Sequence, residues 1–307
     1  MSMLDIQTEK AMEVAKPVGT TGKSVARAIH RAILSTPFTR KIGDFLHGTW
    51  LGHPLHPVLT DFTVGAWTMA TVFDVAGALT DNDEFRRTGD HLTTAGTISA
   101  VPTAITGIVE FSTIPKPAAA PASFHGMLNA VNFGVYIASI RARKRGNHAQ
   151  GAMLGAVGLG MTMVSAWLGG KLVYTYKVGV DHSDKFEKPQ EWTTVMDVAA
   201  LPMKTPKRVE FDGKPVLVYR EGAEVYAMGA TCSHAGGPLD EGKFSRGCVE
   251  CPWHNSVFNL KNGRVVHGPA THPGPGFEAR IENGKVQIRL CKTRECRKGN
   301  PEGNDYP

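Results

Sequence analysis

Two short segments in the last third of the chain each place one cysteine near one histidine. Cys232 and His234 form the first pair, and Cys251 and His254 follow after sixteen intervening residues. Glycine and proline surround both pairs, which indicates loops. Two thiolates and two neutral imidazoles are good ligands for a transition metal, and each loop supplies one of each kind. The two loops must therefore close together over one shared centre.

The order of these residues separates the centre from two other kinds of cysteine site. Structural zinc sites usually pair Cys with Cys in one knuckle and His with His, or Cys with Cys, in the next. A redox cysteine pair requires both sulfurs in one loop. Here each loop contributes a single cysteine and a single histidine. The spacing therefore favours an iron–sulfur centre with mixed ligands over structural zinc or plain core packing.

The region from 192 to 290 resembles the Rieske [2Fe-2S] family. The flanking residues that carry this resemblance are Val225-Tyr226-Ala227-Met228, Pro238-Leu239, Glu241-Gly242, Phe258-Asn259-Leu260 and Gly268-Pro269-Ala270, with a closing alternation of Val286, Ile288 and Leu290. The resemblance implies that Cys232 and Cys251 bind one iron of a [2Fe-2S] cluster. It also implies that His234 and His254 bind the other iron.

The same resemblance suggests how the cluster potential is tuned. High-potential members carry a serine two residues after the second histidine and a tyrosine two residues further on. Ser256 is present here, but Phe258 lacks the tyrosine hydroxyl. Some members also bridge the loops with a disulfide, whose positions here are Gly237 and Trp253. Rieske centres span about −150 to +300 mV, and we expect a value below the high end.

Read without any family, this region is still all-β. Three short runs are rich in β-branched and aromatic residues, and turn pairs bound them. The runs are 215–219, 224–228 and 285–290, and the turn pairs are Asp212-Gly213, Glu221-Gly222 and Asn283-Gly284. This pattern predicts the hairpins of a small sandwich.

Length and charge bound the rest of the molecule. The chain has 307 residues, which leaves room for another domain before the β-rich region. Its formal net charge of +6 is scattered along the sequence. A scattered basic surface is usually just solvated, so nucleic acid is not an expected partner.

Four weakly polar stretches in the first half approach membrane-spanning length. They are 58–80, 91–109, 124–140 and 151–173. About twenty apolar residues are needed to cross a bilayer as a helix, so these stretches predict four transmembrane helices. Small residues recur in them, as in Gly151, Gly155 and Gly158, and this suits close helix packing in lipid. A soluble helical bundle is the alternative.

This half also resembles an uncharacterised bacterial four-helix membrane family. The resemblance rests on His53-Pro54-Leu55-His56-Pro57, on His125 with Leu128-Asn129, and on the run from Gly169 to Tyr174. It covers roughly 48–181 and implies a fold and a location, but no reaction. Ionisable residues inside spans are costly, so Asp61, Asp74 and Glu110 are candidate functional positions.

Four histidines are expected on one face of the membrane. With four spans, the starts of spans one and three and the end of span four share a side, which places His53, His56, His125 and His182 there. Such a group suits haem b, another metal or proton exchange with a quinone. The alternative is a structural role at the membrane interface. On the third span, His125, Asn129 and Asn132 share a helical face, where hydrogen bonding between helices is the alternative to function.

The expected fold is multidomain: an α-helical four-helix transmembrane bundle followed by an all-β Rieske-type domain. The segment 24–47 in the N-terminal part is expected to form an amphipathic surface helix interrupted at Pro37, with an ordinary solvated helix as the alternative. The expected divisions are a tail at 1–50, the membrane domain at 51–181, a linker at 182–191, the Rieske domain at 192–291 and a disordered tail at 292–307.

Three functions follow from this organisation. The first is a membrane-anchored iron–sulfur protein that transfers single electrons between unknown donor and acceptor proteins or quinone, with lipid around its helices. The second is the electron-donor component of an oxygenase system; an oxygenase itself would need a mononuclear iron domain after the Rieske domain, where only 291–307 remain. The third is a redox sensor.

The sequence gives conflicting signals for the orientation in the membrane. The basic residues Arg141, Arg143, Lys144 and Arg145 argue for a cytoplasmic loop, whereas the basic N-terminal part and the missing disulfide favour a cytoplasmic Rieske domain.

Overall fold

The computed structural model describes residues 16–187 and 191–291. The expected disordered tail, 292–307, lies outside the described residues. The chain forms two compact units. Unit 1 contains the described residues up to Ala32 together with Pro54–Val178, and unit 2 contains Ile33–His53 together with the described residues from Gly179 onward. The polypeptide therefore contributes to unit 2 both before and after the helical part of unit 1.

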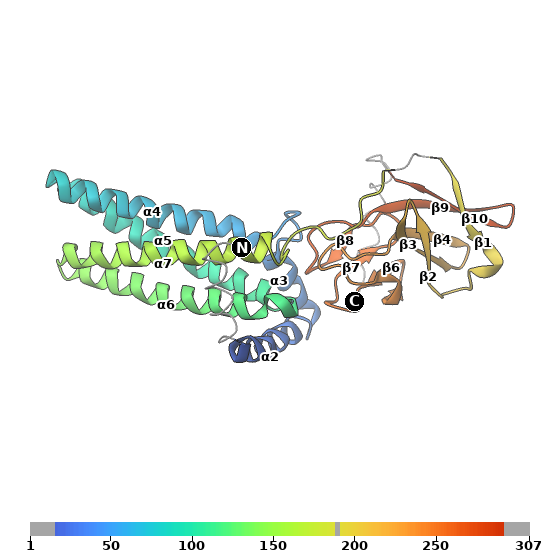
Figure 1. Cartoon of the computed structure of the whole chain (residues 1–307), viewed down its shortest axis with the longest axis horizontal. Helices are drawn as coiled ribbons and strands as arrows, with labels where there is room; N and C mark the ends of the chain where they lie inside the picture. Colours follow the sequence, from blue (N-terminus) through green and yellow to red (C-terminus); the bar gives the residue numbers. More distant parts are fainter. Residues whose placement is uncertain (1–15, 188–190, 292–307) are drawn as a thin grey trace. The chain divides into compact units, whose positions relative to one another are not determined.

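Unit 1 is helical. Its elements are α2 (Lys16–Ile33), α4 (Leu55–Thr80), α5 (Asp83–Phe111), the short 3-10 helix η1 (Lys116–Ala118), α6 (Ala119–Lys144) and α7 (His148–Tyr174). The last four long helices run side by side (Figure 1), with α4 packed along α5 and α6 along α7. Only two residues separate α4 from α5, and the Asn82 side chain there accepts the backbone N–H of Glu84 at 2.8 Å. Such short capped connections produce antiparallel neighbours.

The bundle of α4 to α7 has a polar interior and an apolar exterior. Polar side chains such as Thr63, Thr97 and Asn132 are buried. Apolar side chains are exposed instead, as shown by Phe62 and Ile98, which are each 67% exposed. In water this arrangement would be unfavourable, but in lipid the exterior must be apolar and the interior groups must bond one another. Asn132 indeed donates to the Thr162 hydroxyl at 2.9 Å. The arrangement supports a membrane bundle over the soluble alternative.

Three of these helices, α4, α5 and α7, are long and apolar enough to cross a membrane. The fourth expected span, 124–140, lies inside α6. That helix is long enough, but its middle carries His125, Asn129 and Asn132 and is therefore more polar. All four expected spans therefore fall within helices of the bundle, and α6 completes it by packing along α7.

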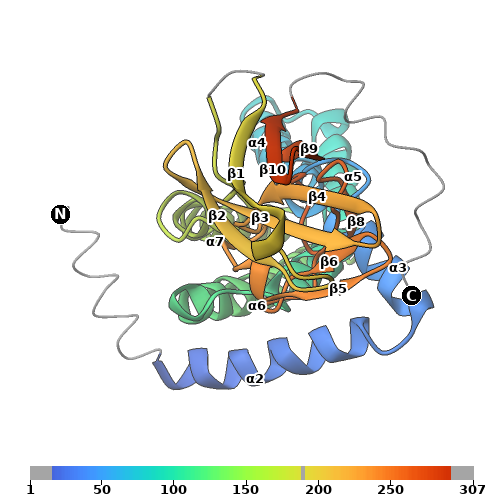
Figure 2. The same ribbon diagram turned by 90° about the vertical axis from the view of Figure 1, so that its right-hand side faces the viewer.

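The N-terminal segment expected to be amphipathic forms two helices. Figure 2 shows α2 as one continuous helix, and α3 (Pro37–His47) follows it. The interruption predicted at Pro37 is present: Thr36 caps α3, with its hydroxyl accepting the Thr39 N–H at 3.1 Å, and proline occupies the first helical position. Helix α2 belongs to unit 1, where Ala26 packs against Ala118, Ala119 and Ala122. Helix α3 belongs to unit 2.

The rest of unit 2 is built from two antiparallel sheets. The larger has the strand order β1-β10-β9-β4-β3-β2 and the smaller β5-β6-β7-β8. The bounds are β1 Thr193–Asp197, β2 Lys207–Phe211, β3 Lys214–Glu221, β4 Glu224–Gly229, β5 Lys243–Ser245, β6 Cys248–Glu250, β7 Val257–Asn259, β8 Val265–His267, β9 Gly276–Glu282 and β10 Lys285–Leu290, with 3-10 helices η2 (Val198–Ala200) and η3 (Leu239–Glu241).

Both faces of the larger sheet are buried. Side chains alternate along β3, so Leu217 and Tyr219 enter one core while Val216 and Val218 enter the other. The first core also contains Cys232 and Cys251. The two candidate cysteine ligands are therefore anchored in a packed interior between the two sheets.

Candidate functional site

Two loops built on the same pattern carry the Cys/His pairs. The first loop, 230–238, follows β4, and the second loop, 251–256, joins β6 to β7. In each, the cysteine N–H donates to a carbonyl five residues later, Gly237 in the first and Ser256 in the second, both at 2.8 Å. A backbone N–H four residues later returns to the cysteine carbonyl, from Gly236 at 2.9 Å and from Asn255 at 3.1 Å. These last two residues have positive φ, 78° and 61°, which glycine and asparagine tolerate best.

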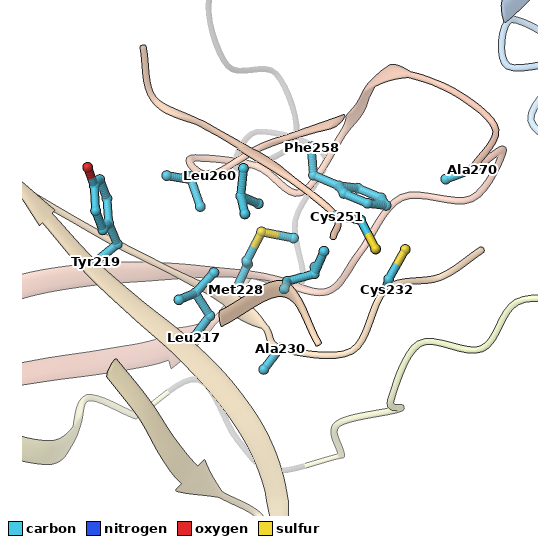
Figure 3. Close-up of a cluster of buried hydrophobic side chains, with 11 residues drawn as sticks. Leu217, Tyr219, Met228, Ala230, Cys232, Cys251, Phe258, Leu260 and Ala270 are labelled. Atoms are coloured by element: carbon cyan, nitrogen blue, oxygen red, sulfur yellow. The ribbon is translucent and has the colours of Figure 1, made fainter. Parts of the chain in front are cut away.

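The two thiols meet in the core. Cys232 and Cys251 are 1% and 2% exposed, and their sulfurs point toward one another (Figure 3). Backbone N–H groups of His234 and Ala235 donate to the Cys232 sulfur, and those of Trp253 and His254 donate to the Cys251 sulfur. Each loop thus turns its own N–H groups toward its own thiol, an arrangement that stabilises thiolates.

A hydrogen bond between the Cys232 and Cys251 side chains shifts the pKa values of the two thiols in opposite directions. The bond to Cys251, together with burial, raises the pKa of Cys232 well above its ordinary value. The same bond, assisted by the N–H groups of Trp253 and His254, lowers the pKa of Cys251 to about 7 despite burial. By contrast, burial raises the pKa of Cys248, which lies on β6 outside the loops, to about 11. The pair therefore readily yields one thiolate, whereas Cys248 stays a protonated core residue.

The two imidazoles lie opposite one another at the same end of the unit. The ring centroids of His234 and His254 are 5.0 Å apart, and the rings are nearly perpendicular, at 84°. Both rings are partly exposed, whereas the two sulfurs are buried. All four residues predicted from the sequence are thus brought together, with the imidazoles nearer to solvent.

Gly237 and Trp253 contact one another across the two loops. A Cβ atom at Gly237 would stand 3.1 Å from the Trp253 ring and 2.8 Å from the Cys251 sulfur. The two residues at the positions of the family's disulfide are therefore adjacent in space. In this chain the Trp253 indole packs on Gly237 and joins the two loops where some relatives have the disulfide. Trp253 is also 55% exposed, so part of its ring faces outward.

A third loop, 268–275, between β8 and β9, is tied to both of the others. The Ala270 N–H donates to the Ser256 hydroxyl at 3.0 Å, and the Ser233 hydroxyl donates to the His272 carbonyl. Ser256 is fully buried. Because its hydroxyl oxygen accepts from Ala270, its own proton remains available to a neighbouring acceptor.

Two further segments, which the sequence did not connect with the site, hold these loops from outside. In α3, Asp44 accepts from His267 Nδ1 at 2.7 Å and from the Gly268 N–H at 2.8 Å. Arg40 in the same helix donates to the Asn255 carbonyl at 3.1 Å. After the bundle, the His182 N–H donates to the Ser233 carbonyl at 2.9 Å. The described part of the expected linker, 182–187, therefore begins against the first loop.

The four histidines expected on one face fall into two units. His56 on α4 and His125 on α6 belong to unit 1, whereas His53 and His182 belong to unit 2. His56 Nδ1 donates to the Thr103 carbonyl at 2.9 Å. Across the described residues, no three His, Cys, Asp or Glu side chains gather around a single ion position. These histidines therefore do not form a mononuclear metal site with carboxylate or thiolate partners there.

Hydrogen bonds use both ring nitrogens of His125. Its Nδ1 donates to the Ser165 carbonyl at 3.0 Å, and its Nε2 lies 3.1 Å from the Asn129 amide nitrogen, which donates to it. The Ser165 hydroxyl also donates to the Asn129 side-chain oxygen at 2.9 Å, which completes a cycle of hydrogen bonds among the three residues. The expected helical face of His125 and Asn129 is thus engaged in hydrogen bonds between α6 and α7.

A buried charge network at Arg143 was not anticipated. The Arg143 guanidinium contacts Asp74 at 2.5 Å and Asp90 at 2.7 Å, and His148 lies 3.3 Å from Asp90. These residues come from α6, α4, α5 and α7, so one network joins all four helices. Its sequence signal was Asp74 alone. The sequence places Arg143 among the basic residues of a predicted loop, but the structure buries it inside the bundle, where it is only 6% exposed.

Family models match both halves of the chain. A model for a Rieske [2Fe-2S] domain matches residues 191–288, and a model described as a predicted membrane protein, DUF2231, matches residues 52–182. These matches confirm the two resemblances and their order along the chain. They also support a membrane location, because α4, α5 and α7 lie within the second match.

Three curated proteins illustrate the similarity. Apoptosis-inducing factor 3 of Mus musculus is 36% identical over 109 residues, which are 35% of this chain but only 18% of that protein. The anthranilate 1,2-dioxygenase ferredoxin subunit of Burkholderia cepacia is 38% identical over 77 residues, 25% of this chain and 71% of that protein. Ferredoxin CarAc of Metapseudomonas resinovorans is 34% identical over 100 residues, 32% of this chain and 94% of that protein. Two of the three are therefore covered over most of their length.

Proposed function

Because the chain belongs to the Rieske [2Fe-2S] family, with its Rieske domain joined to a DUF2231 membrane domain, we propose that it is a membrane-anchored carrier of single electrons. The observation that carries the proposal is the convergence of two thiols and two imidazoles from loops of identical closure. Cys232 and Cys251 are the proposed ligands of one iron, and His234 and His254 those of the other. When bound, the cluster accepts and releases one electron.

The residues present fit such a cluster. Two sulfurs that already receive backbone N–H groups can hold thiolate charge in a buried site, and the missing Cβ of Gly237 leaves space beside Cys251. The partly exposed imidazoles lie between the buried sulfurs and solvent. The path of an electron from the site to the surface is therefore shorter through the imidazoles than through the sulfurs. The exposed ring of Trp253 beside His254 is the proposed contact for a redox partner, since aromatic anchors dominate such interfaces.

The relatives favour an oxygenase-type acceptor. One of them is named as the ferredoxin subunit of an anthranilate 1,2-dioxygenase, and another as a ferredoxin. We therefore propose that this chain passes electrons from a reductase to an oxidising partner of that class, with redox sensing as the second candidate. Repeated turnover separates the two: a carrier is reduced and reoxidised many times per minute by its partners, whereas a sensor needs only one change of state.

The proposed ligands can be tested on the full chain purified in mild detergent under anaerobic conditions. We expect two irons and two sulfides per chain and a Rieske-type electron paramagnetic resonance signal after reduction. Cys251→Ser and His234→Ala should lose this signal, because each removes a ligand. Cys248→Ser is the matched control: it alters a buried cysteine three residues from Cys251 and should keep the signal. Zinc in place of iron, or an unchanged His234→Ala spectrum, would contradict the assignment.

A second cofactor in the membrane bundle, haem b or quinone, has a narrower basis. Of the four histidines predicted for it, His56 and His125 lie in unit 1, and His125 already uses both ring nitrogens in hydrogen bonds. This supports the structural alternative for His125. Haem absorbance that is present in the purified protein and lost in His56→Ala would overturn the structural role. Quinone-dependent reoxidation that is present in the wild-type protein and lost in His125→Ala would do the same.

A further inference from the structure

Helix α3 has an exposed apolar face. Phe38, Ile42 and Phe45 follow one another at i, i+4 and i+7, so they share one side of the helix. Their exposed fractions are 72%, 43% and 57%, and Trp50, just after the helix, is 61% exposed. Trp50 stacks on Phe45 with ring centroids 5.7 Å apart, and its indole N–H donates to the Phe45 carbonyl at 3.1 Å. We call these four residues the α3 apolar face.

The opposite side of α3 is occupied by its own domain. Arg40, Asp44 and His47 have the same spacing, but they are offset by two residues, which places them about half a turn away from the apolar face. Arg40 and Asp44 bind the second and third loops, and His47 is 2% exposed. Since the polar side is held against the cluster loops, the apolar face must point away from the Rieske domain.

The position of this face along the chain indicates what covers it. Trp50 is five residues before Leu55, where the apolar helix α4 begins. Five extended residues reach at most about 18 Å, so the face cannot lie far from the point where the chain enters the membrane. Tryptophan is enriched at that level of a bilayer, and helices with one apolar and one polar side lie in the same layer.

A second copy of the chain is a poorer occupant. Stable pairs of proteins bury about 800 Å² on each partner. Three side chains on one short helix and Trp50 just after it, which is already stacked on Phe45, offer less than that. The chemistry and connectivity of the face instead match the interfacial layer of a lipid bilayer.

We propose that α3 lies in the interfacial layer of the membrane, with the α3 apolar face against lipid, while Arg40 and Asp44 hold the cluster loops from the opposite side. This rests on the proposed membrane anchoring, but it assigns a contact outside the bundle. The electron-transfer site would then be fixed at a defined distance from the lipid surface.

The test uses the full chain in phosphatidylcholine–phosphatidylglycerol vesicles that contain lipids brominated near the headgroup or deep in the acyl chains. Bromine quenches tryptophan fluorescence only at contact range. The emission that Trp50→Phe removes should be roughly halved by shallow bromine and less affected by deep bromine. The emission that Trp253→Phe removes is the control on the Rieske domain and should be quenched by neither.

Trp167 on α7 distinguishes the two proposals. If the emission removed by Trp167→Phe is quenched by deep bromine but that removed by Trp50→Phe is not quenched at all, the bundle is in the membrane and the α3 proposal is wrong. If neither is quenched, the membrane anchoring itself fails.

A variant tests whether the face positions the domain. Phe45→Glu should abolish shallow quenching of Trp50 and should make the resonance signal of the reduced cluster independent of angle in oriented membrane layers. Ile281→Glu, which alters an exposed apolar residue on β9 of the same unit, should leave both unchanged. Retention of the cluster signal in solution shows that each variant is folded. A change of oligomeric state in Phe45→Glu, with Trp50 quenching unaltered, would assign the face to a second copy and overturn the proposal.

Discussion

At the scale of single residues, Ser256 is expected to tune the potential of the cluster. Its hydroxyl accepts the Ala270 N–H and retains a proton, so it can donate to a nearby sulfur when the cluster is bound. A donor to sulfur stabilises the reduced state, and removing it in Ser256→Ala should lower the midpoint potential by about 60 mV, equivalent to roughly 1.4 kcal/mol for one electron.

Redox titration of the resonance signal measures this shift. Cys248→Ser serves as the control, because Cys248 is equally buried yet lies outside the loops. An unmoved potential in Ser256→Ala would show that the hydroxyl does not reach the cluster.

The four ligand candidates were predictable from the sequence, because thiolates and imidazoles in glycine-rich loops carry the chemistry in their residue types. The turn residues that shape the loops were less visible. Asn255 has a positive φ of 61° that only the structure reveals. The outer partners Arg40 and Asp44 could not be predicted, since no local pattern links them to residues more than 200 positions later.

At the scale of elements, the regular structure was largely predictable. Apolar runs longer than about eighteen residues and short β-branched runs between turn pairs are strong signals. Each predicted span lies inside α4, α5, α6 or α7, and the predicted strands 215–219, 224–228 and 285–290 coincide with β3, β4 and β10. The predicted turns at Asp212-Gly213 and Asn283-Gly284 have the expected positive φ values. What failed was the assignment of charges near helix ends, because Arg143 looks like a loop cation in sequence.

The Arg143 network should be a main support of the bundle. Arg143→Met would leave the Asp74 carboxylate buried without its cation, and breaking such a buried pair costs about 3–5 kcal/mol. We expect a markedly lower midpoint in thermal unfolding followed by helical circular dichroism in detergent. Arg141→Met is the matched control, because Arg141 is exposed two residues earlier.

The double variant Arg143→Met with Asp74→Asn should recover part of the loss, since it removes one of the two stranded charges. Equal midpoints for Arg143→Met and Arg141→Met would rule out the network as a source of stability.

At the scale of the whole molecule, the side of the membrane that the Rieske domain occupies is our remaining proposal. Arg141, Lys144 and Arg145 favour a cytoplasmic α6–α7 connection, whereas Arg143 is buried in its ion pairs and is not a charge of that connection. Basic Lys23, Arg27 and Arg31 of α2 oppose them. The Gly237–Trp253 contact in place of a disulfide suits a reducing compartment. We therefore propose a cytoplasmic Rieske domain.

Ferricyanide, which does not cross membranes, can decide this. Added to inverted vesicles, it should oxidise the prereduced cluster at once, whereas right-side-out vesicles should respond only after detergent is added. Both preparations should respond equally when permeabilised. Immediate oxidation in right-side-out vesicles would place the domain on the outer face.

The pairing of Asp44 with His267 spans 223 positions of the chain, and this has a consequence for biogenesis. A ribosome makes α3 before the bundle, but its partners in the third loop emerge only after four helices and most of both sheets. Asp44 therefore has neither of these partners until β8 has been synthesised. Long-range contacts of this kind form late. We expect iron delivery to be the last step of maturation, and chains that terminate before β8 to reach the membrane yet remain unable to retain a cluster.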